Sequence, residues 1–221
     1  MGKAYANKKK QDDRPKDDTY HTPFSLTWKL NEVETFSHVW EPCNGKGAIS
    51  KNIKNLEKTS DIATGTDFLK YNENWNGDIV TNFPFYLWDE CVQHAKNIIS
   101  GRLCTIGRIN YFGTYQRTEI GIWNNLHKVY IFNRYVDYQT PYREDGKFHV
   151  GALCTGWFIW NKNWKEDYHL IYHLDIQEYA VLGSYNMICG FCNKQINKYD
   201  EYCPVCGKYN KKYIGVGEVK K

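Results

Sequence analysis

Segments with strand and helix character alternate along most of this chain, and no other feature constrains the fold as much. Apolar residues recur at helical spacing over Phe24–Phe36, and a short apolar strand follows at His38–Glu41. Helical spacing returns over Ala48–Leu56, the sequence GDIVTN at 77–82 is typical of a buried strand, and Leu87–Ile99 of an amphipathic helix. This alternation predicts an α/β domain with a largely parallel sheet.

The second half of the pattern continues with further strands and one helix. Strands are expected at Leu103–Ile106, Lys128–Phe132, Leu153–Trp160 and His169–Leu174, and a helix near Tyr115–Leu126. The closing strands have the pattern of an antiparallel hairpin at a sheet edge. Between them, residues 133–150 are rich in Tyr, Arg, Gln and Gly, which is the composition of an exposed functional loop.

Length and composition favour one catalytic-size domain with a small appendage. The chain has 221 residues, of which 42% are hydrophobic and 16% aromatic. Residues 1–18 are polar and charged and are expected to form a flexible basic arm. With no apolar core of a signal peptide and no long apolar run, we expect an intracellular protein without a membrane partner, in a bacterial or phage-infected cell. The net charge of +4 permits a nucleic-acid partner without requiring one.

The segment VWEPCNGKGAI at 39–49 is a candidate ligand-binding turn. An apolar strand ends at Glu41, and Gly45 and Gly47 open the next segment, where glycine lets the backbone approach a ligand. A tight turn with no ligand would have the same pattern. Asp61 follows a second expected strand, where nucleotide-binding α/β folds hold ribose hydroxyls, and Asp67–Phe68 would suit an adenine amino group and ring. Each acid alone could equally be a surface charge or a helix cap.

The segment TNFPF at 81–85 carries the sharpest chemical signal. The side chain of Asn82 and the main chain of Phe83 each offer a carbonyl, so the two together can accept both hydrogens of an exocyclic amine. Pro84 stiffens the turn, and Phe85 can stack on a base. Such an arrangement leaves the nitrogen lone pair free to attack a sulfonium methyl group. The alternative is a strand that simply ends in an aromatic–proline turn.

Several short motifs together resemble the phage-type DNA N6-adenine methyltransferase family. They are YHTP (20–23), EPCNGKG (41–47), SDI (60–62), GTDFL (65–69), TNFPF (81–85) and GWFIWNK (156–162), and the resemblance covers roughly residues 19–175. It implies a class I methyltransferase fold, a seven-stranded Rossmann-like and mostly parallel sheet, with S-adenosylmethionine over the strand ends. The domain implied spans 19–180.

The resemblance also implies roles for individual residues. Tyr20, Thr22 and Pro23 are similar to the N-terminal cofactor motif, Glu41, Gly45 and Gly47 to the methionine-binding turn, Asp61 to the ribose contact, Asp67 and Phe68 to the adenine contact, and Asn82, Phe83, Pro84 and Phe85 to the catalytic tetrapeptide. Phe83 departs from the family, which usually has proline there. A bulky residue before the proline resembles ribosomal RNA adenine dimethyltransferases, which keeps RNA open as the substrate.

An adenine inside a duplex cannot reach such a site, so the base would have to be flipped out or the substrate be single-stranded. Candidate stacking residues are Tyr111, Phe112 and Tyr115, with core packing as the alternative for at least one of them, and candidate phosphate contacts are Arg108 and Arg117.

Two CxxC pairs near the C-terminus predict a structural zinc site. The ligands would be Cys189, Cys192, Cys203 and Cys206, in a zinc ribbon over 186–212. Lysines around these pairs would suit a phosphate backbone, although zinc ribbons also dock proteins or act as caps. The other cysteines, Cys43, Cys91, Cys104 and Cys154, are expected to be buried small hydrophobic residues. His169 and His173 are expected to serve in packing rather than in metal binding.

The sequence therefore predicts an enzyme that transfers methyl from S-adenosylmethionine to the adenine amino group of DNA. Two alternatives remain: the same chemistry on RNA, or a non-catalytic module that binds nucleic acid or protein on a degenerate methyltransferase fold. With only the loop at 133–150 and the ribbon available to read bases, the recognition site is expected to be short or relaxed.

Overall fold

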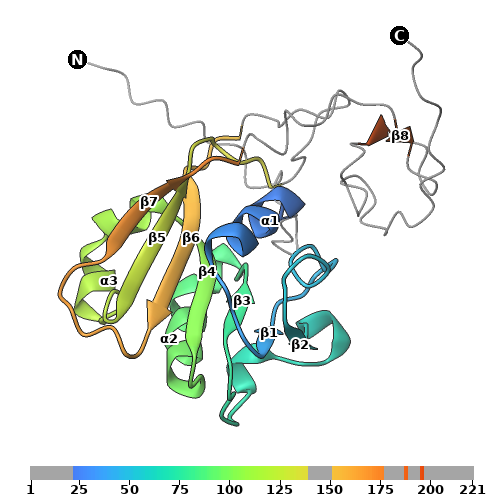
Figure 1. Cartoon of the computed structure of the whole chain (residues 1–221). Helices are drawn as coiled ribbons and strands as arrows, with labels where there is room; N and C mark the ends of the chain where they lie inside the picture. Colours follow the sequence, from blue (N-terminus) through green and yellow to red (C-terminus); the bar gives the residue numbers. More distant parts are fainter. Residues whose placement is uncertain (1–21, 139–150, 177–186, 189–194, 197–221) are drawn as a thin grey trace, which may run out of the picture.

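A seven-stranded sheet organises the chain (Figure 1). The computed structural model describes residues 22–138, 151–176, 187–188 and 195–196. The strands are β1 (Val39–Glu41), β2 (Leu56–Thr59), β3 (Ile79–Thr81), β4 (Arg102–Arg108), β5 (Leu126–Phe132), β6 (Thr155–Asn161) and β7 (Leu170–Leu174), in the spatial order β2-β1-β3-β4-β6-β5-β7. Only β6 runs antiparallel to its neighbours in this sheet. The expected α/β class and the seven-stranded, mostly parallel Rossmann-like sheet are confirmed.

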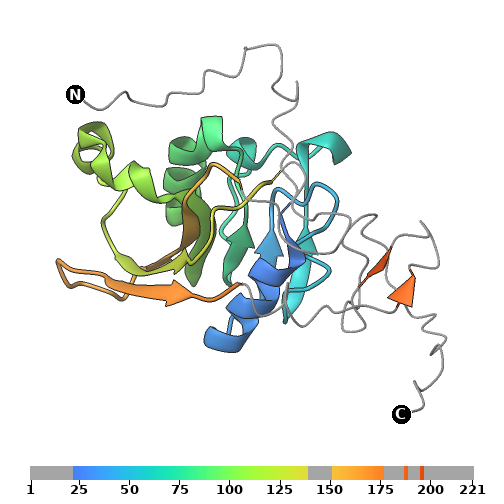
Figure 2. The same cartoon turned by 90° about the horizontal axis from the view of Figure 1, so that it is seen from above.

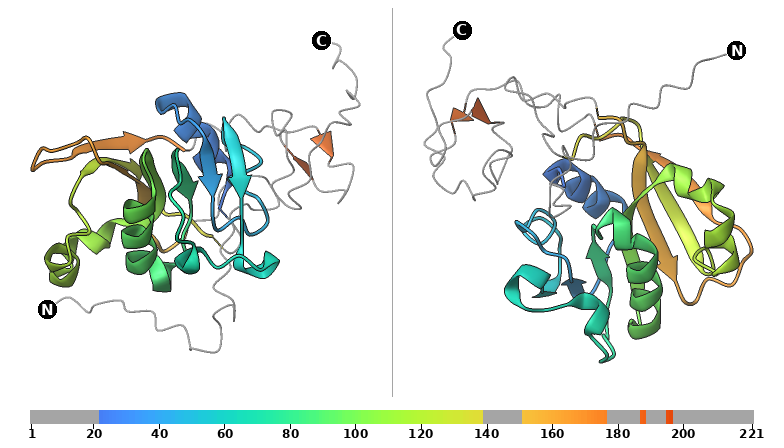
Figure 3. Two further views of the ribbon diagram at one scale, coloured as in Figure 1. Left: turned by 90° about the horizontal axis from the view of Figure 1, so that it is seen from below. Right: turned by 180° about the vertical axis from the view of Figure 1, so that it is seen from behind.

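Helices cover both faces of the sheet. The α-helices are α1 (Phe24–Val33), α2 (Trp88–Ile98) and α3 (Tyr115–Glu119), and short 3₁₀ turns are η2 (Ile62–Thr64), η3 (Phe68–Lys70), η4 (Phe85–Leu87) and η5 (Ile109–Gly113). Seen from above, α1 lies on one side of the sheet and α2 and α3 on the other (Figure 2). The views from below and behind agree (Figure 3). None of the helices in the described part of the chain has the length and apolar character needed to cross a bilayer.

Strand β6 joins the two helical layers because its alternate side chains point to opposite faces. The indole Nε1 of Trp157 donates to the carbonyl of Leu26 in α1 at 3.0 Å. On the other face, Phe158 and Trp160 each lie with ring centroids 5.8 Å from Trp88 of α2. All five residues are buried, so this antiparallel strand lies at the centre of the hydrophobic core.

A buried ion-pair network fixes the end of α1 to the sheet. The carboxylate of Glu34 accepts hydrogen bonds from Arg102 Nη1 at 2.9 Å, Lys128 Nζ at 2.6 Å and the Tyr130 hydroxyl at 2.7 Å. Burial alone would raise the pKa of Glu34, but these hydrogen bonds and the two cations lower it overall. The ionised carboxylate therefore links α1 to β4 and β5.

One expected helix is absent and another is shorter than expected, and contacts between residues close in sequence explain both differences. Residues 48–55 form irregular turns and Leu56 already begins β2, because Asn52 Nδ2 donates to the carbonyl of Ala48 at 2.8 Å and so competes with the helical backbone pattern. The helix expected over Tyr115–Leu126 ends at Glu119. Gly121, with a φ of +69°, follows in the left-handed conformation, and Ile122 N–H closes the turn on the carbonyl of Arg117 at 3.0 Å.

The closing strands are only partly as expected. β5 and β6 pair antiparallel, but β6 lies between β4 and β5, and β7 forms the sheet edge beside β5. The expected position of the antiparallel pair at the edge is therefore wrong. Between β4 and β5, strand β6 has a neighbour on each side, and its two tryptophans, Trp157 and Trp160, are buried on opposite faces of the sheet.

The strand order reverses between β1 and β3. From β1 the chain moves outward to β2, then returns to form β3 on the other side of β1. In open α/β sheets, ligands bind outside the carboxyl ends of the strands at such a point. A ligand-binding site is therefore expected at the residues that follow β1 and β3.

Candidate functional site

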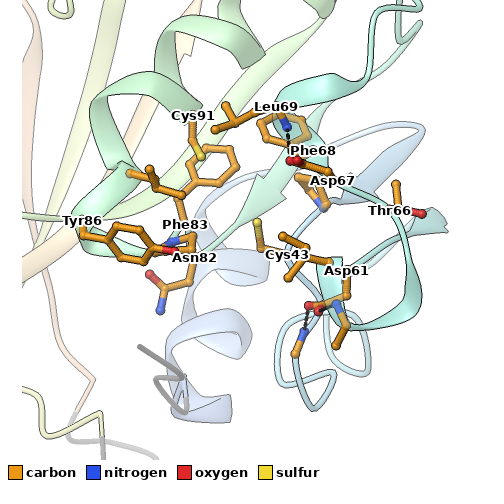
Figure 4. A pocket seen from close by; sticks show the side chains of 16 residues that line it. Cys43, Asp61, Thr66, Asp67, Phe68, Leu69, Asn82, Phe83, Tyr86 and Cys91 are labelled. Carbon is orange, nitrogen blue, oxygen red and sulfur yellow. Dashed lines mark hydrogen bonds between the residues drawn. The ribbon is translucent and has the colours of Figure 1, made fainter. Parts of the chain in front are cut away.

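A cavity of about 410 Å³ lies beyond the carboxyl ends of β1 and β3 (Figure 4). This volume is in the range of sites that hold cofactor-sized molecules. Its walls are formed by Pro42, Cys43, Gly45, Asp61, Ile62, Ala63, Thr66, Asp67, Phe68, Leu69, Asn82, Phe83, Pro84, Tyr86, Leu87 and Cys91. Seven of the residues singled out in the sequence are among them, from Gly45 to Pro84.

Asp61 fixes the glycine turn to the segment after β2. Its carboxylate accepts a hydrogen bond from Gly45 N–H at 2.7 Å through Oδ2 and from Ala63 N–H at 2.9 Å through Oδ1. Gly45 has a φ of +50°, a conformation that L-residues with side chains rarely adopt. Each carboxylate oxygen has a further lone pair, so Asp61 can still accept from ligand hydroxyl groups.

Asp67 and Phe68 stand beside each other but have different environments. Asp67 caps η3 by accepting from Leu69 N–H at 3.1 Å, and its other oxygen lies 3.2 Å from Lys70 Nζ. The ring of Phe68 is only 4% exposed and stacks on the ring of Phe83 at a centroid distance of 5.2 Å. Phe68 therefore forms part of the cavity wall, and most of its ring belongs to the core.

Asn82 has an unused acceptor at the end of β3. Its Nδ2 donates to the Thr22 hydroxyl at 3.1 Å, which holds the amide plane in place. Its Oδ1 is buried and accepts no hydrogen bond from the described part of the chain. A buried carbonyl without a donor is costly, so an acceptor in this position is suited to a ligand that brings an N–H group.

Phe83, which departs from the family pattern, uses its ring for packing. The side chain is 1% exposed and lies against Phe68 in the core. Its main-chain carbonyl is unaffected by the identity of the side chain, so the substitution of proline by phenylalanine leaves that acceptor chemically intact. The structure thus gives a packing reason for phenylalanine at this position.

Glu41 is a buried acid beneath the glycine turn. Its side chain is 2% exposed, and its Oε2 atom has no hydrogen-bond partner among the described residues. Burial raises the pKa of Glu41 to about 8, and the charge of Asp61 adds to this, while hydrogen bonds from Ser50 act in the opposite direction. Near neutral pH, Glu41 is therefore largely protonated and would ionise readily if a cation came near.

The remaining predicted site residues are outside the cavity wall. Thr22 and Pro23 are buried at the start of α1, where Thr22 contacts Asn82. Glu41 is buried at the end of β1, Gly47 is part of the turn that follows, and Phe85 is buried at the start of η4. Tyr20 lies outside the described residues. So do the predicted zinc ligands Cys189, Cys192, Cys203 and Cys206, and most of the loop at 133–150.

Two short strands, β8 (Met187–Ile188) and β9 (Gln195–Ile196), pair antiparallel on either side of the first CxxC in the sequence. Within the described ranges, no group of three or more His, Cys, Asp or Glu side chains could hold a metal. The zinc ribbon and the domain boundaries stay predictions.

Sequence reasoning missed several residues of the cavity. Cys43 and Cys91 line it, and burial raises the pKa of the Cys91 thiol to about 12, so this thiol stays neutral at physiological pH. Cys91 and Cys104 are buried as expected, but Cys43 is only half-buried and Cys154 is exposed, so the expectation is wrong for Cys154 and only partly met for Cys43. Tyr86 also lines the cavity; its position directly after the tetrapeptide was an available signal.

Of the side chains predicted to contact the substrate, several serve in packing and one is exposed away from the cavity. Arg117 Nε lies 2.6 Å from Asp89 Oδ1, and its guanidinium covers the ring of Tyr111, so both side chains are used in packing. Phe112 stacks between Trp123 and His169, which also gives this histidine the packing role expected for it. Tyr115 is exposed but does not line the cavity.

The arrangement combines acceptors of two kinds around one cavity. In Figure 4, Asp61 and Asp67 lie on one side, and Asn82 and Tyr86 on the other. The carboxylates suit hydroxyl and amino groups, and the carbonyls of Asn82 and Phe83 suit an uncharged amine. The two sides of the cavity therefore offer hydrogen-bond acceptors of different kinds.

Comparisons with known proteins give similarities of fold. No family model and no curated protein matches the chain. Among solved structures, a predicted O-methyltransferase from Agrobacterium tumefaciens has a TM-score of 0.42 at 11% identity, over 70% of this chain and 86% of that one. The methyltransferase subunit of a type I restriction-modification system from Streptococcus thermophilus gives 0.45 at 10%, over 80% and 49%. The 23S rRNA methyltransferase ErmE gives 0.42 at 11%, over 74% and 76%.

Proposed function

We propose that the chain transfers a methyl group from S-adenosylmethionine to the exocyclic amino group of adenine in DNA. The observation that carries this proposal is Asn82, which lines a cavity also lined by Asp61 and Asp67, and whose buried Oδ1 atom accepts no hydrogen bond within the described structure. An amide oxygen is neutral and cannot remove a proton, so it orients an amine rather than ionising it.

The residues present fit S-adenosylmethionine, which when bound supplies an electrophilic methyl group on a positively charged sulfur. Asp61 would accept from the ribose hydroxyls, and Asp67 from the adenine amino group. Gly45 would allow close approach of the backbone. The unpaired Glu41 Oε2 atom lies behind this turn, and a nearby positive charge would favour its ionised form. Thr22, which accepts a hydrogen bond from Asn82 Nδ2, links the start of α1 to the catalytic segment.

Catalysis would then be mainly positioning. The carbonyl groups of Asn82 and Phe83 accept the two amine hydrogens, so the nitrogen lone pair is directed at the methyl carbon. As the nitrogen–carbon bond forms, the carbon–sulfur bond breaks and its electron pair stays on sulfur, which becomes a neutral thioether. The methylated nitrogen then loses one proton to water. No covalent enzyme intermediate is needed.

RNA is the second candidate substrate, and Phe83 is the residue that keeps it open. Assays with labelled S-adenosylmethionine on separate pools of unmethylated DNA and RNA distinguish the two. Label in N6-methyladenine of the DNA pool supports the proposal. Label only in the RNA pool would identify RNA as the substrate. Label in neither pool, from protein that binds the cofactor, refutes an enzymatic role on nucleic acid.

A structural zinc ion in the ribbon at 186–212 belongs to the same proposal. The spacing of Cys189, Cys192, Cys203 and Cys206 supports four thiolate ligands in tetrahedral geometry. The lysines around them would suit contact with the backbone of the nucleic acid.

A further inference from the structure

Three aromatic side chains follow Asn82 within four residues, and they differ sharply in exposure. Phe83 is 1% exposed, Phe85 is 9% exposed and Tyr86 is 69% exposed. A ring can stack on a base only if one of its faces is open. Exposure therefore separates the one available ring in this segment from the two that are committed to the core.

The ring of Phe85 is already covered by other side chains. The Arg108 guanidinium lies over it at 4.8 Å from the ring centroid, and the ring of Tyr138 packs nearly perpendicular to it at a centroid distance of 5.9 Å. Placing a base on Phe85 would mean displacing a cation–π contact and a buried tyrosine. The base stacking that the sequence predicted for Phe85 would therefore require these side chains to rearrange.

The 3₁₀ turn η4 explains why neighbouring rings point in different directions. The turn is closed by Leu87 N–H donating to the carbonyl of Pro84 at 3.0 Å. Successive residues of a 3₁₀ helix are separated by about 120° around its axis, so Phe85 can face the core while Tyr86 faces outward. Tyr86 lines the cavity together with Asn82 and Pro84.

We propose that Tyr86, rather than Phe85, is the ring on which the target base stacks while Asn82 and Phe83 hold its amino group. This inference rests on the proposed methyl transfer. The base would come from a flipped or single-stranded nucleotide, because only an unstacked base can lie against an exposed ring. In Figure 4, Tyr86 lies on the same side of the cavity as Asn82 and away from Asp61, which leaves that opposite wall for the cofactor.

The test compares Tyr86→Ala and Tyr86→Phe with the matched control Tyr168→Ala. Tyr168 is a similarly exposed tyrosine that does not line this cavity. We measure kcat/KM for single-stranded DNA and RNA, the Kd for S-adenosylmethionine, and the fluorescence of an oligonucleotide with 2-aminopurine at the target position. Loss of base stacking is expected to lower kcat/KM of Tyr86→Ala by about 5- to 150-fold. Tyr86→Phe, which keeps the ring, should stay within a few-fold of the unmodified protein.

The outcomes distinguish this inference from the proposed function. Loss of kcat/KM in Tyr86→Ala alone, with the cofactor Kd unchanged and the 2-aminopurine signal altered, supports the stacking role. Equal kcat/KM for Tyr86→Ala and Tyr168→Ala overturns it while leaving methyl transfer intact. Absence of transfer by the unmodified protein refutes the proposed function; 2-aminopurine binding that Tyr86→Ala does not change then overturns the stacking role as well.

Discussion

Replacing Glu41 by Gln should change how the stability of the fold depends on pH. The pKa of Glu41 is about 8 in the folded protein against 4.5 for an ordinary glutamate. Below pH 4.5 both states carry the proton. Between these values the unfolded chain loses its proton while the folded protein keeps it, so the free energy of unfolding falls by about 1.4 kcal/mol per pH unit. Above pH 8 the loss is complete, with an upper bound of about 5 kcal/mol for this residue.

Glutamine has a similar shape and no proton to lose, so Glu41→Gln removes this pH dependence. Urea unfolding followed by tryptophan fluorescence at several pH values from 5 to 8 measures the effect, with the exposed Glu119→Gln as a control for the change of charge. We expect the stability of Glu41→Gln relative to the unmodified protein to increase steadily with pH. The size of a pH-independent difference in the free energy of unfolding between the two proteins does not bear on the protonation of Glu41. If the free energies of unfolding of the two proteins change with pH in parallel over this range, a protonated, buried Glu41 is refuted.

Three further predictions follow from other parts of the molecule. Glu34→Ala leaves Arg102 and Lys128 without their shared carboxylate and should destabilise the fold by about 3–5 kcal/mol, measured by urea unfolding; a loss below about 1 kcal/mol would contradict the network. The intact chain should contain one equivalent of zinc by elemental analysis, and Cys203→Ser should lose it; retention of full zinc by this variant would exclude Cys203 as a ligand. Affinity for S-adenosylmethionine should rise with pH up to about 8, by at most tenfold per unit, as Glu41 ionises, and a pH-independent Kd in calorimetry would argue against a nearby cation.

Much of the fold could be predicted because it depends on local patterns. The strands around Glu41, Val80 and Cys104 were predicted to within about two residues, since buried parallel strands give continuous apolar runs. The segment 48–56 has apolar residues at helical spacing, and Ile49 and Ile53 are indeed buried, but asparagine side chains compete for its backbone groups. Apolar periodicity reports which side chains are buried and does not report this competition.

The candidate site could be predicted in its outline and not in its details. Gly45, Asp61 and Asn82 meet in one cavity because the carboxyl ends of neighbouring parallel strands share an edge of the sheet. Whether Phe85 or Tyr86 offers an open ring depends on Arg108 and on other residues distant in sequence. Such tertiary contacts leave no short-range signal in the sequence.

The most direct test of the proposed chemistry is methyl transfer by Asn82→Ala beside Thr22→Val. Both variants lose the hydrogen bond between Asn82 Nδ2 and the Thr22 hydroxyl, but only the first also removes the unpaired Oδ1 acceptor. Transfer of labelled methyl to adenine in DNA should fall about 10²–10³-fold in Asn82→Ala, as when a preorganised polar group is lost from other active sites, and clearly less in Thr22→Val. Equal transfer by Asn82→Ala and the unmodified protein would contradict the account.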